Sequence, residues 1–415
     1  MNRLFGFVQM GLSGFRVLIF VVSTQLFLQG CAATPLPARF EKAQAAELKG
    51  DHVKALNLYR GISKNGKRAQ DRLMARFRAA GVLYAMGLFE KAMEEYLETT
   101  RYAAGEARKY AQARMVAARA LYRAGCIAYD KLGGSNPERK EEGLRLWWRA
   151  LNHYPGEVAA DEALVRVVRH NREQGRLKEI VKDLWALFRR FRRADIADNL
   201  LWNLGEIYEK DFNAPDHAVE IFAKLAKIKP HGPLTYDASM RTARLYRRLG
   251  KPLKALLFYA KILETKKDTW IVGTFTSEFA DDAQLEIGIL RLDDMKDPVK
   301  AIEEFRRLVD DFQTSILRDD ALWWIAIAEL RRDNMKGAKR AHKELVRRFP
   351  KSRFVDRAAQ LMNWTLVAQA IKRGDNEKLC DELAVHAEKY PFGWFRQRRK
   401  TLSKRFDCGR FAEDD

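Results

Sequence analysis

The stretch Asp319 to Pro350 reads DDALWWIAIAELRRDNMKGAKRAHKELVRRFP and predicts a pair of helices. Its first half opens with two acids, which the positive end of a helix dipole favours, and its apolar residues recur with helical spacing. After a polar break, its second half has an apolar stripe made of Ala338, Ala341, Leu345 and Phe349, and the proline ends it. Such a hairpin cannot bury its apolar stripe alone, so it must stack on copies of itself.

Copies of this hairpin recur along the chain. Each second helix is marked by a small residue near its start and a bulky residue four positions later, as in Ala55 with Tyr59 and Ala218 with Phe222. The markers stand at positions 55, 92, 143, 180, 218, 255, 301, 338 and 379, of which 180 and 379 are degenerate. Four of the eight intervals equal 37 residues, which predicts an all-α array of about nine helical hairpins over residues 39–392.

Three second helices carry a family pattern. GDHVKALNLY from Gly50, GLFEKAMEEY from Gly87 and GKPLKALLFY from Gly250 share G-x4-A-x3-Y, which resembles the second half of a tetratricopeptide repeat. The string FP-x-S-x5-A at 349–358 is similar to the repeats of BamD-like and YbgF-like outer-membrane lipoproteins and to the α-solenoid of soluble lytic transglycosylases. These resemblances imply a tetratricopeptide-like α-solenoid, and they specify architecture better than function.

The first 31 residues form an export pattern. Arg3 and Arg16 precede the apolar run VLIFVVSTQLFL, which ends in Leu28-Gln29-Gly30-Cys31. This resembles a bacterial lipoprotein signal, so residues 1–30 are expected to be a signal peptide, Cys31 the lipidated residue and residues 31–38 a linker. An uncleaved membrane anchor or a buried strand are the alternatives.

The resemblance to lipoprotein signals also implies a location. Ala32 follows the cysteine, where enteric lipoproteins retained in the inner membrane have aspartate. The expected location is therefore the outer membrane, with the lipid-anchored chain facing the periplasm. Several acyl chains on one cysteine would make this attachment stable.

The charge of the chain favours an anionic partner. Its 415 residues carry a net charge of +21, and removal of the signal, which holds two arginines and no acid, leaves +19. Nucleic acid, acidic lipid, an acidic protein and a cell-wall polymer all fit such a surface, but export excludes nucleic acid. Basic clusters occur at 189–193, 241–254 and 396–405.

Residues 393–415 are expected to form a basic C-terminal cap or tail. Its densest cluster, predicted as a binding patch, consists of Arg396, Arg398, Arg399 and Lys400. An oxidising periplasm permits a disulfide, and Cys380 and Cys408 could join the last hairpin to the tail. We expect Cys126 to pack as a small apolar side chain.

The sequence holds no recognisable catalytic or metal-binding motif. Its seven histidines are never within four residues of one another, and no P-loop, HExxH, CxxC or transglycosylase Glu-Ser pair occurs. We therefore expect a protein that is not an enzyme and that has no cofactor. Two tryptophan doublets, at 147–148 and 323–324, could stack on sugars or pack between hairpins.

Together these features predict a lipid-anchored periplasmic scaffold that binds protein partners in cell-envelope assembly or maintenance. The alternative is a non-catalytic peptidoglycan-binding relative of the lytic transglycosylase solenoid. The two differ in what they retain: the first would hold polypeptides, and the second would cosediment with cell wall.

Overall fold

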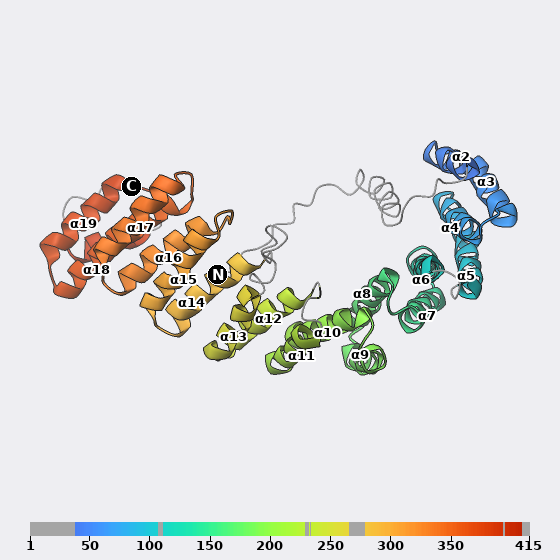
Figure 1. Ribbon diagram of the computed structural model, residues 1–415. Coiled ribbons are helices and arrows are strands. Elements are labelled where there is room, and N and C mark those ends of the chain that lie inside the picture. The colour runs from blue at the N-terminus through green and yellow to red at the C-terminus, as the bar shows by residue number, and fades with distance from the viewer. Residues whose placement is uncertain are drawn as a thin grey trace. The chain divides into compact units, whose positions relative to one another are not determined.

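The computed structural model describes residues 38–106, 111–228, 232, 234–264, 279–392 and 395–408 (Figure 1). Within these residues the chain forms nineteen α-helices and three short π-helical turns, with no β-strand, which confirms the all-α prediction. The expected signal peptide, Cys31 and the residues that link it to the array lie outside the described residues.

The helices of the described residues are α2 (Ala38–Leu48), α3 (His52–Asn65), α4 (Ala69–Ala85), α5 (Phe89–Glu106), α6 (Ala111–Cys126), η2 (Ile127–Leu132), α7 (Pro137–His153), α8 (Val158–Glu173), α9 (Leu177–Phe191), α10 (Ile196–Glu206), η3 (Ile207–Asp211), α11 (Pro215–Ile228), α12 (Thr235–Arg248), α13 (Pro252–Glu264), α14 (Ala280–Ile289), η5 (Leu290–Asp294), α15 (Pro298–Asp311), α16 (Arg318–Arg331), α17 (Met335–Arg348), α18 (Phe354–Arg373), α19 (Asn376–Lys389) and α20 (Arg396–Arg405).

The helices α2 to α19 fall into nine consecutive pairs in the described part of the chain, as the sequence predicts. Every marker position lies in the second helix of its pair, and all nine are buried. The bulky residues that follow them, such as Tyr59, Phe222 and Phe305, are fully buried as well. In most of the hairpins, therefore, a small residue near the start of the second helix is buried together with a large one four positions later.

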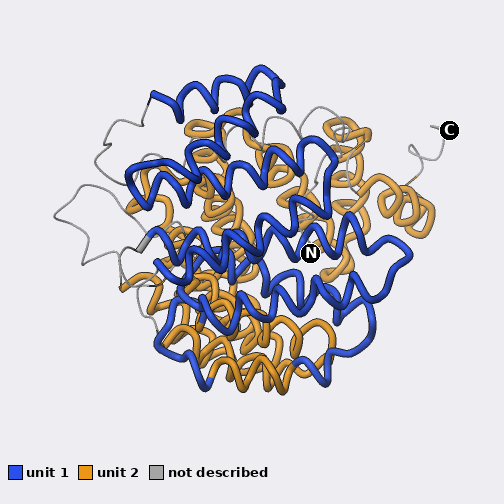
Figure 2. The backbone as a smooth tube through the Cα atoms, turned by 90° about the vertical axis from the view of Figure 1, so that its right-hand side faces the viewer, with its two compact units in different colours: residues 1–180, 189–196 blue, residues 181–188, 197–415 orange. Residues whose placement is uncertain are grey.

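Two compact units make up the chain (Figure 2). Unit 1 comprises residues 1–180 and 189–196, and unit 2 comprises residues 181–188 and 197–415. In unit 1, one apolar cluster joins α4, α5 and α6. In unit 2, successive clusters join α12 to α14, α14 to α18, and α18 to α20.

Most turns between paired helices in the described residues contain a left-handed residue. Gly50, Gly87 and Gly250 have φ of 76°, 75° and 67°, a region that glycine enters without steric cost. Asn213 and Lys296 take this conformation in two other hairpins. The glycine of the G-x4-A-x3-Y pattern is thus the residue that reverses the chain.

A serine links one hairpin to the next in unit 2. Ser352 Oγ donates to Asp319 Oδ2 at 2.7 Å and accepts from the backbone N–H of Phe354 at 3.1 Å. Ser315 does the same with Asp281, at 2.6 Å, one hairpin earlier. The serine of the FP-x-S-x5-A string therefore begins one first helix and bonds to the acid that opens the preceding one.

Three first helices, α6, α10 and α14, end in a π-helical turn within the described residues. Gly205 in α10 precedes the marker Ala218 by 13 positions, whereas Ala243 in α12 precedes the marker Ala255 by 12. The pair α14 and α15 also has the longer spacing. A π-turn closes its hydrogen bonds over one more residue than an α-turn, so it absorbs the extra residue without shifting the packed positions.

Glycine precedes each of these π-turns because an aromatic ring lies against the helix there. A Cβ built on Gly205 would lie 2.6 Å from Phe222 Cζ, and one built on Gly288 would clash with Phe305. These contacts are closer than real Cβ atoms make, so only glycine fits.

Candidate functional site

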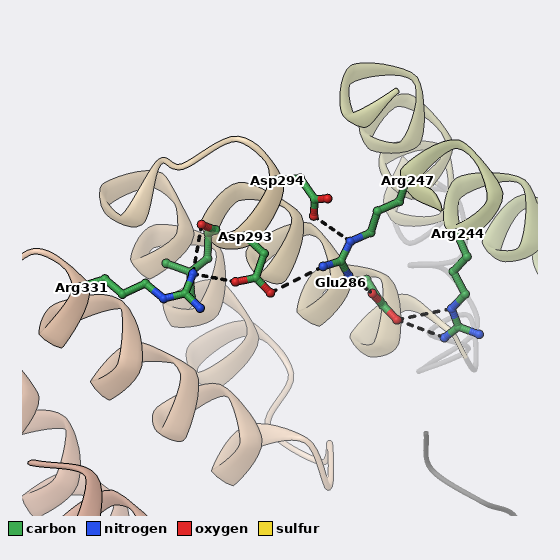
Figure 3. Close-up of polar contacts among 7 residues, drawn as sticks. Arg244, Arg247, Glu286, Asp293, Asp294 and Arg331 are labelled. Carbon is green, nitrogen blue, oxygen red and sulfur yellow. Dashed lines mark hydrogen bonds and ion pairs between the residues drawn. The ribbon is translucent and has the colours of Figure 1, made fainter. Parts of the chain in front are cut away.

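Arginine side chains of α12 reach carboxylates of the following hairpin in unit 2 (Figure 3). Arg247 Nε lies 2.7 Å from Asp294 Oδ2, and its Nη2 lies 3.6 Å from Asp293 Oδ2. Its Nη1 lies 3.4 Å from Glu286 Oε2. One guanidinium therefore contacts three carboxylates, two of which come from the π-turn η5.

The same network continues to the next first helix. Arg331 of α16 donates to Asp293 Oδ1 at 2.6 Å and to the backbone carbonyl of Leu292 at 3.3 Å. On the other side, Arg244 pairs with Glu286 at 3.3 Å (Figure 3). Asp293 thus joins α12 to α16 across η5, and networks of this kind stabilise more than isolated surface pairs do.

The preceding hairpin supplies further partners for α12. Arg241 Nε lies 2.7 Å from Glu209 Oε2 of η3, and Arg248 lies 3.4 Å from the same carboxylate. Each arginine of the basic cluster at 241–254 therefore has a carboxylate from a neighbouring hairpin. The arginines of this cluster therefore link neighbouring hairpins through ion pairs, and their positive charge is not free.

An open hollow of about 400 Å³ lies over this network, lined by Arg244, Arg247, Arg248, Glu286 and Asp294. Its lining has three cations and two carboxylates, and Arg244 and Arg248 keep more than half of their side chains exposed. Such a mixed surface suits the polar groups of a polypeptide better than it suits a polyanion.

Arg399, predicted as part of an exposed basic patch, is buried with 8% of its surface exposed. Its guanidinium donates to the backbone carbonyls of His386 at 3.3 Å, Tyr390 at 3.1 Å and Pro391 at 3.3 Å. The first of these carbonyls lies in the last turn of α19 and the other two directly follow the helix, a region where a helix leaves backbone acceptors that its own amides do not fill. The patch prediction is corrected here, because Arg399 caps a helix instead of facing solvent.

The other patch residues lie on α20 with different surroundings. Arg396 and Arg398 are exposed, and their guanidinium carbons lie 5.6 Å from the Phe392 ring centroid and 5.7 Å from that of Trp364. Lys400 is half-buried. Only part of the predicted patch is therefore available to a partner.

A disulfide joins Cys380 of α19 to Cys408, with a Cα–Cα distance of 5.3 Å. Phe395, which precedes α20, stacks on Trp364 of α18 at 4.6 Å. Apolar residues of α18, α19 and α20 form one cluster around these groups. The segment after the last hairpin thus packs as a terminal cap, which covers the apolar face that another hairpin would otherwise bury.

The side chains of Cys126 and of the tryptophan doublets pack against other residues of the fold. Cys126 is half-buried, and burial raises the pKa of its thiol, which lowers its reactivity. Trp147 is fully buried. Trp323 stacks on Phe354 at 5.6 Å, and Trp324 lies parallel to a phenylalanine of the preceding hairpin at 6.2 Å. These rings pack between helices, as expected of core residues.

Neither a metal centre nor a membrane span is found in the described part of the chain. No group of three or more His, Cys, Asp or Glu side chains is placed to hold a metal ion there. No helix among those residues combines the length and apolar character that crossing a bilayer requires.

Sequence reasoning missed the basic face of α17, because it searched for runs of consecutive charges. The signal is periodic instead: in MKGAKRAHKELVRR the exposed helical positions are basic or apolar, and the one acid, Glu344, is half-buried.

Comparison with known proteins identifies one of the repeats. Residues 320–352 match the tetratricopeptide repeat family. No curated protein sequence matches the chain. Similar solved structures include a tetratricopeptide repeat protein from Parabacteroides merdae, with 17% identity over 61% of this chain and 94% of that one, and a TM-score of 0.37.

Two further structures are similar at the same level. PilW, a type IV pilus biogenesis factor, has 14% identity over 69% of this chain and 98% of its own, with a TM-score of 0.32. The tetratricopeptide-like repeats of a Podosopora anserina putative kinesin light chain have 14% identity over 43% of this chain and 90% of theirs, with a TM-score of 0.34. Scores this low carry no functional argument. The chain is a tetratricopeptide-like α-solenoid in which one repeat, residues 320–352, matches the family itself.

Proposed function

We propose that this protein is a lipid-anchored scaffold on the periplasmic side of the outer membrane, which binds protein partners in cell-envelope assembly or maintenance. The observation that carries the proposal is the run of nine consecutive helical hairpins in the described residues. Such arrays present extended surfaces that serve as binding platforms, and tetratricopeptide folds generally bind proteins. The proposal includes no catalytic step.

The membrane part of the proposal depends on the N-terminal sequence. Leu28-Gln29-Gly30-Cys31 closes the apolar run as a lipobox does, and Ala32 favours the outer membrane over the inner one. The resemblance of its FP-x-S-x5-A repeat to BamD-like and YbgF-like lipoproteins supports the same proposal.

The structure favours a polypeptide over glycan strands as the partner. The peptidoglycan-binding alternative needs aromatic rings that are open to sugars. Trp147 is fully buried, Trp364 stacks on Phe395, and Trp323 stacks on Phe354. These rings are already engaged within the fold, so protein contacts are the better-supported use of the array.

Replacing the predicted lipidated cysteine tests the anchor. Cys31→Ser should abolish incorporation of radiolabelled fatty acid and release the chain from outer-membrane fractions. Cys126→Ser, at the half-buried free cysteine, should keep both label and location. Label that persists in Cys31→Ser, or wild-type protein that is soluble without detergent, would refute the anchor.

Photo-crosslinking in intact cells tests the partner. A crosslinker at exposed positions such as Arg244 and Arg248, beside the α12 hollow, should capture discrete polypeptides that mass spectrometry identifies. Cosedimentation with purified peptidoglycan, without any crosslinked polypeptide, would contradict the scaffold and favour the cell-wall alternative.

A further inference from the structure

One face of α17 carries a row of basic side chains. They stand at spacings of three, four or seven, which places them along the exposed side of the helix over roughly 16 Å. All five are exposed: Lys336, Lys339, Arg340, Lys343 and Arg347. These five residues are called the α17 ridge below.

The α17 ridge has no neutralising partners in the described part of the chain. No carboxylate of those residues lies within 4.0 Å of its five cationic groups. The arginines of α12 differ, since neighbouring hairpins supply a carboxylate to each of them. Unpaired charge in one row, rather than total charge, is what marks this face as a recognition surface.

The one acid of α17 cannot neutralise the ridge. Glu344 accepts from Arg306 of α15 at 2.5 Å and from Arg348 at 2.8 Å, and 19% of its side chain is exposed. Burial alone would raise its pKa, but the hydrogen bonds from the two arginines outweigh burial and hold the pKa of Glu344 below its usual value. The negative charge of Glu344 is therefore paired with Arg306 and Arg348, at the contact between α15 and α17.

The surroundings of the ridge limit the width of its partner. The Arg306–Glu344 pair places α15 beside α17, and α15 exposes Glu303, Asp310 and Asp311. A broad anionic surface such as a membrane would meet these acids together with the ridge. An acidic segment one chain wide contacts the cations and avoids the carboxylates.

We infer that the α17 ridge binds an acidic polypeptide segment of a partner, a conclusion that rests on the proposed scaffold function and adds the chemistry of what the scaffold holds. Carboxylates four residues apart on a helix, or two apart on an extended segment, lie about 6–7 Å from each other, which matches the spacing of basic side chains along one helix face.

Charge reversal with a matched control tests the inference. The full-length protein, in detergent, would carry Lys336→Glu, Lys339→Glu and Lys343→Glu together. The control carries Lys42→Glu, Lys54→Glu and Lys64→Glu, three exposed lysines of the first hairpin with the same change in net charge. Fluorescence anisotropy would follow a labelled peptide with glutamate at alternate positions, and its glutamine counterpart, at two salt concentrations. Circular dichroism and melting check that both variants fold.

We expect the ridge variant to bind the glutamate peptide about tenfold more weakly than wild type, and the control to stay within about twofold. The affinity of wild type should fall with salt, and the glutamine peptide should not bind. Equal losses in both variants would show attraction by net charge alone and overturn the inference. Ridge-dependent binding to phosphatidylglycerol vesicles, without binding to the peptide, would overturn it in favour of a membrane surface.

The inference and the scaffold proposal can fail separately. If cellular crosslinking persists unchanged in the ridge variant, the inference about the ridge would be refuted and the scaffold proposal would stand. If wild type binds the acidic peptide through the ridge but captures no polypeptide in cells, the inference about the ridge would stand and the scaffold proposal would be refuted.

Discussion

Neighbouring residues of this chain can have opposite roles, as Arg398 and Arg399 show. Arg398 is exposed and lies over the Trp364 ring, whereas Arg399 is buried and donates to carbonyls in and just after the last turn of α19. In the sequence both belong to one basic run. Their helical positions differ by about 100°, so one faces solvent and the other faces the preceding helix.

Arg399→Ala should destabilise the C-terminal cap by roughly 1.5–3 kcal/mol, since hydrogen bonds from a charged group to buried carbonyls would be lost. Hydrogen exchange over 376–408 is the measurement, because it reports local opening. Arg398→Ala is the control and should change protection little. Similar loss of protection in both variants would contradict the capping role of Arg399.

His386 makes the same cap sensitive to pH. Burial, and next the nearby Arg399, hold the pKa of His386 below its usual value, so the folded chain keeps this ring neutral. The unfolded chain takes up a proton near pH 6.5, so stability is lost as pH falls below about 6.5 toward the lower folded pKa. The protection factors over 376–408, which compare the observed exchange with the intrinsic rate at each pH, should therefore fall on acidification.

His386→Phe keeps a ring in the site and removes the titration. The protection factors of this variant should depend less on pH than those of wild type between about pH 7 and 5. An unchanged pH dependence in this variant would assign the effect to other groups.

At the scale of elements, a single residue inserted within a hairpin is accommodated by a π-helical turn. The markers at 180 and 218 lie 38 residues apart rather than 37, and the π-turn η3 lies between them. The extra residue also turns the end of the first helix so that its acids, such as Glu209 and Asp293, reach arginines of the next first helix. Glycine against an aromatic ring accompanies each π-turn.

Gly288→Ala should destabilise the protein by about 1–3 kcal/mol through overpacking against Phe305. Phe305→Leu should restore part of this loss in the double variant. In the control Gly81→Ala the new Cβ would lie 3.5 Å from Tyr96 Oη, an ordinary contact, so the helix propensity of alanine should make this change neutral or stabilising. Urea unfolding compares the three, and equal destabilisation at both glycines would refute the close approach.

At the scale of the whole molecule, the chain consists of two compact units built from hairpins that follow one another in the sequence. Apolar clusters of unit 2 join hairpins that follow one another in the chain. Stability in such an array is close to a sum of hairpin and interface terms, so damage should remain local. Unpaired positive charge also differs from helix to helix: the arginines of α12 form ion pairs, and the residues of the α17 ridge form none in the described part of the chain.

Ala338→Leu tests this locality, because Ala338 is fully buried at the marker position of α17. The larger side chain should overpack by about 1–3 kcal/mol and speed hydrogen exchange in α15 to α18. Exchange in α3 to α5 of unit 1 should not change. Lys336→Leu, at an exposed position of the same helix, is the control and should leave both regions close to wild type. Uniform acceleration across both units would contradict nearest-neighbour packing.

The sequence by itself determined the class of fold and the positions of its repeats. The markers from Ala55 to Leu379 are all buried in second helices, because apolar period and small-to-large spacing are local properties that stacking cannot alter. The single stretch Asp319–Pro350 was sufficient to define the hairpin, and the family match at 320–352 lies on it.

Only the tertiary structure decided which charges are free. Arg247 and Arg340 both stand in basic helices, yet Arg247 meets carboxylates that lie 39 to 47 residues away, and Arg340 meets none among the described residues. Arg399 is removed from the surface by carbonyls of another helix. Pairing and burial depend on side chains that packing brings together from separate hairpins. The separation of two residues along the sequence does not tell whether their side chains come close.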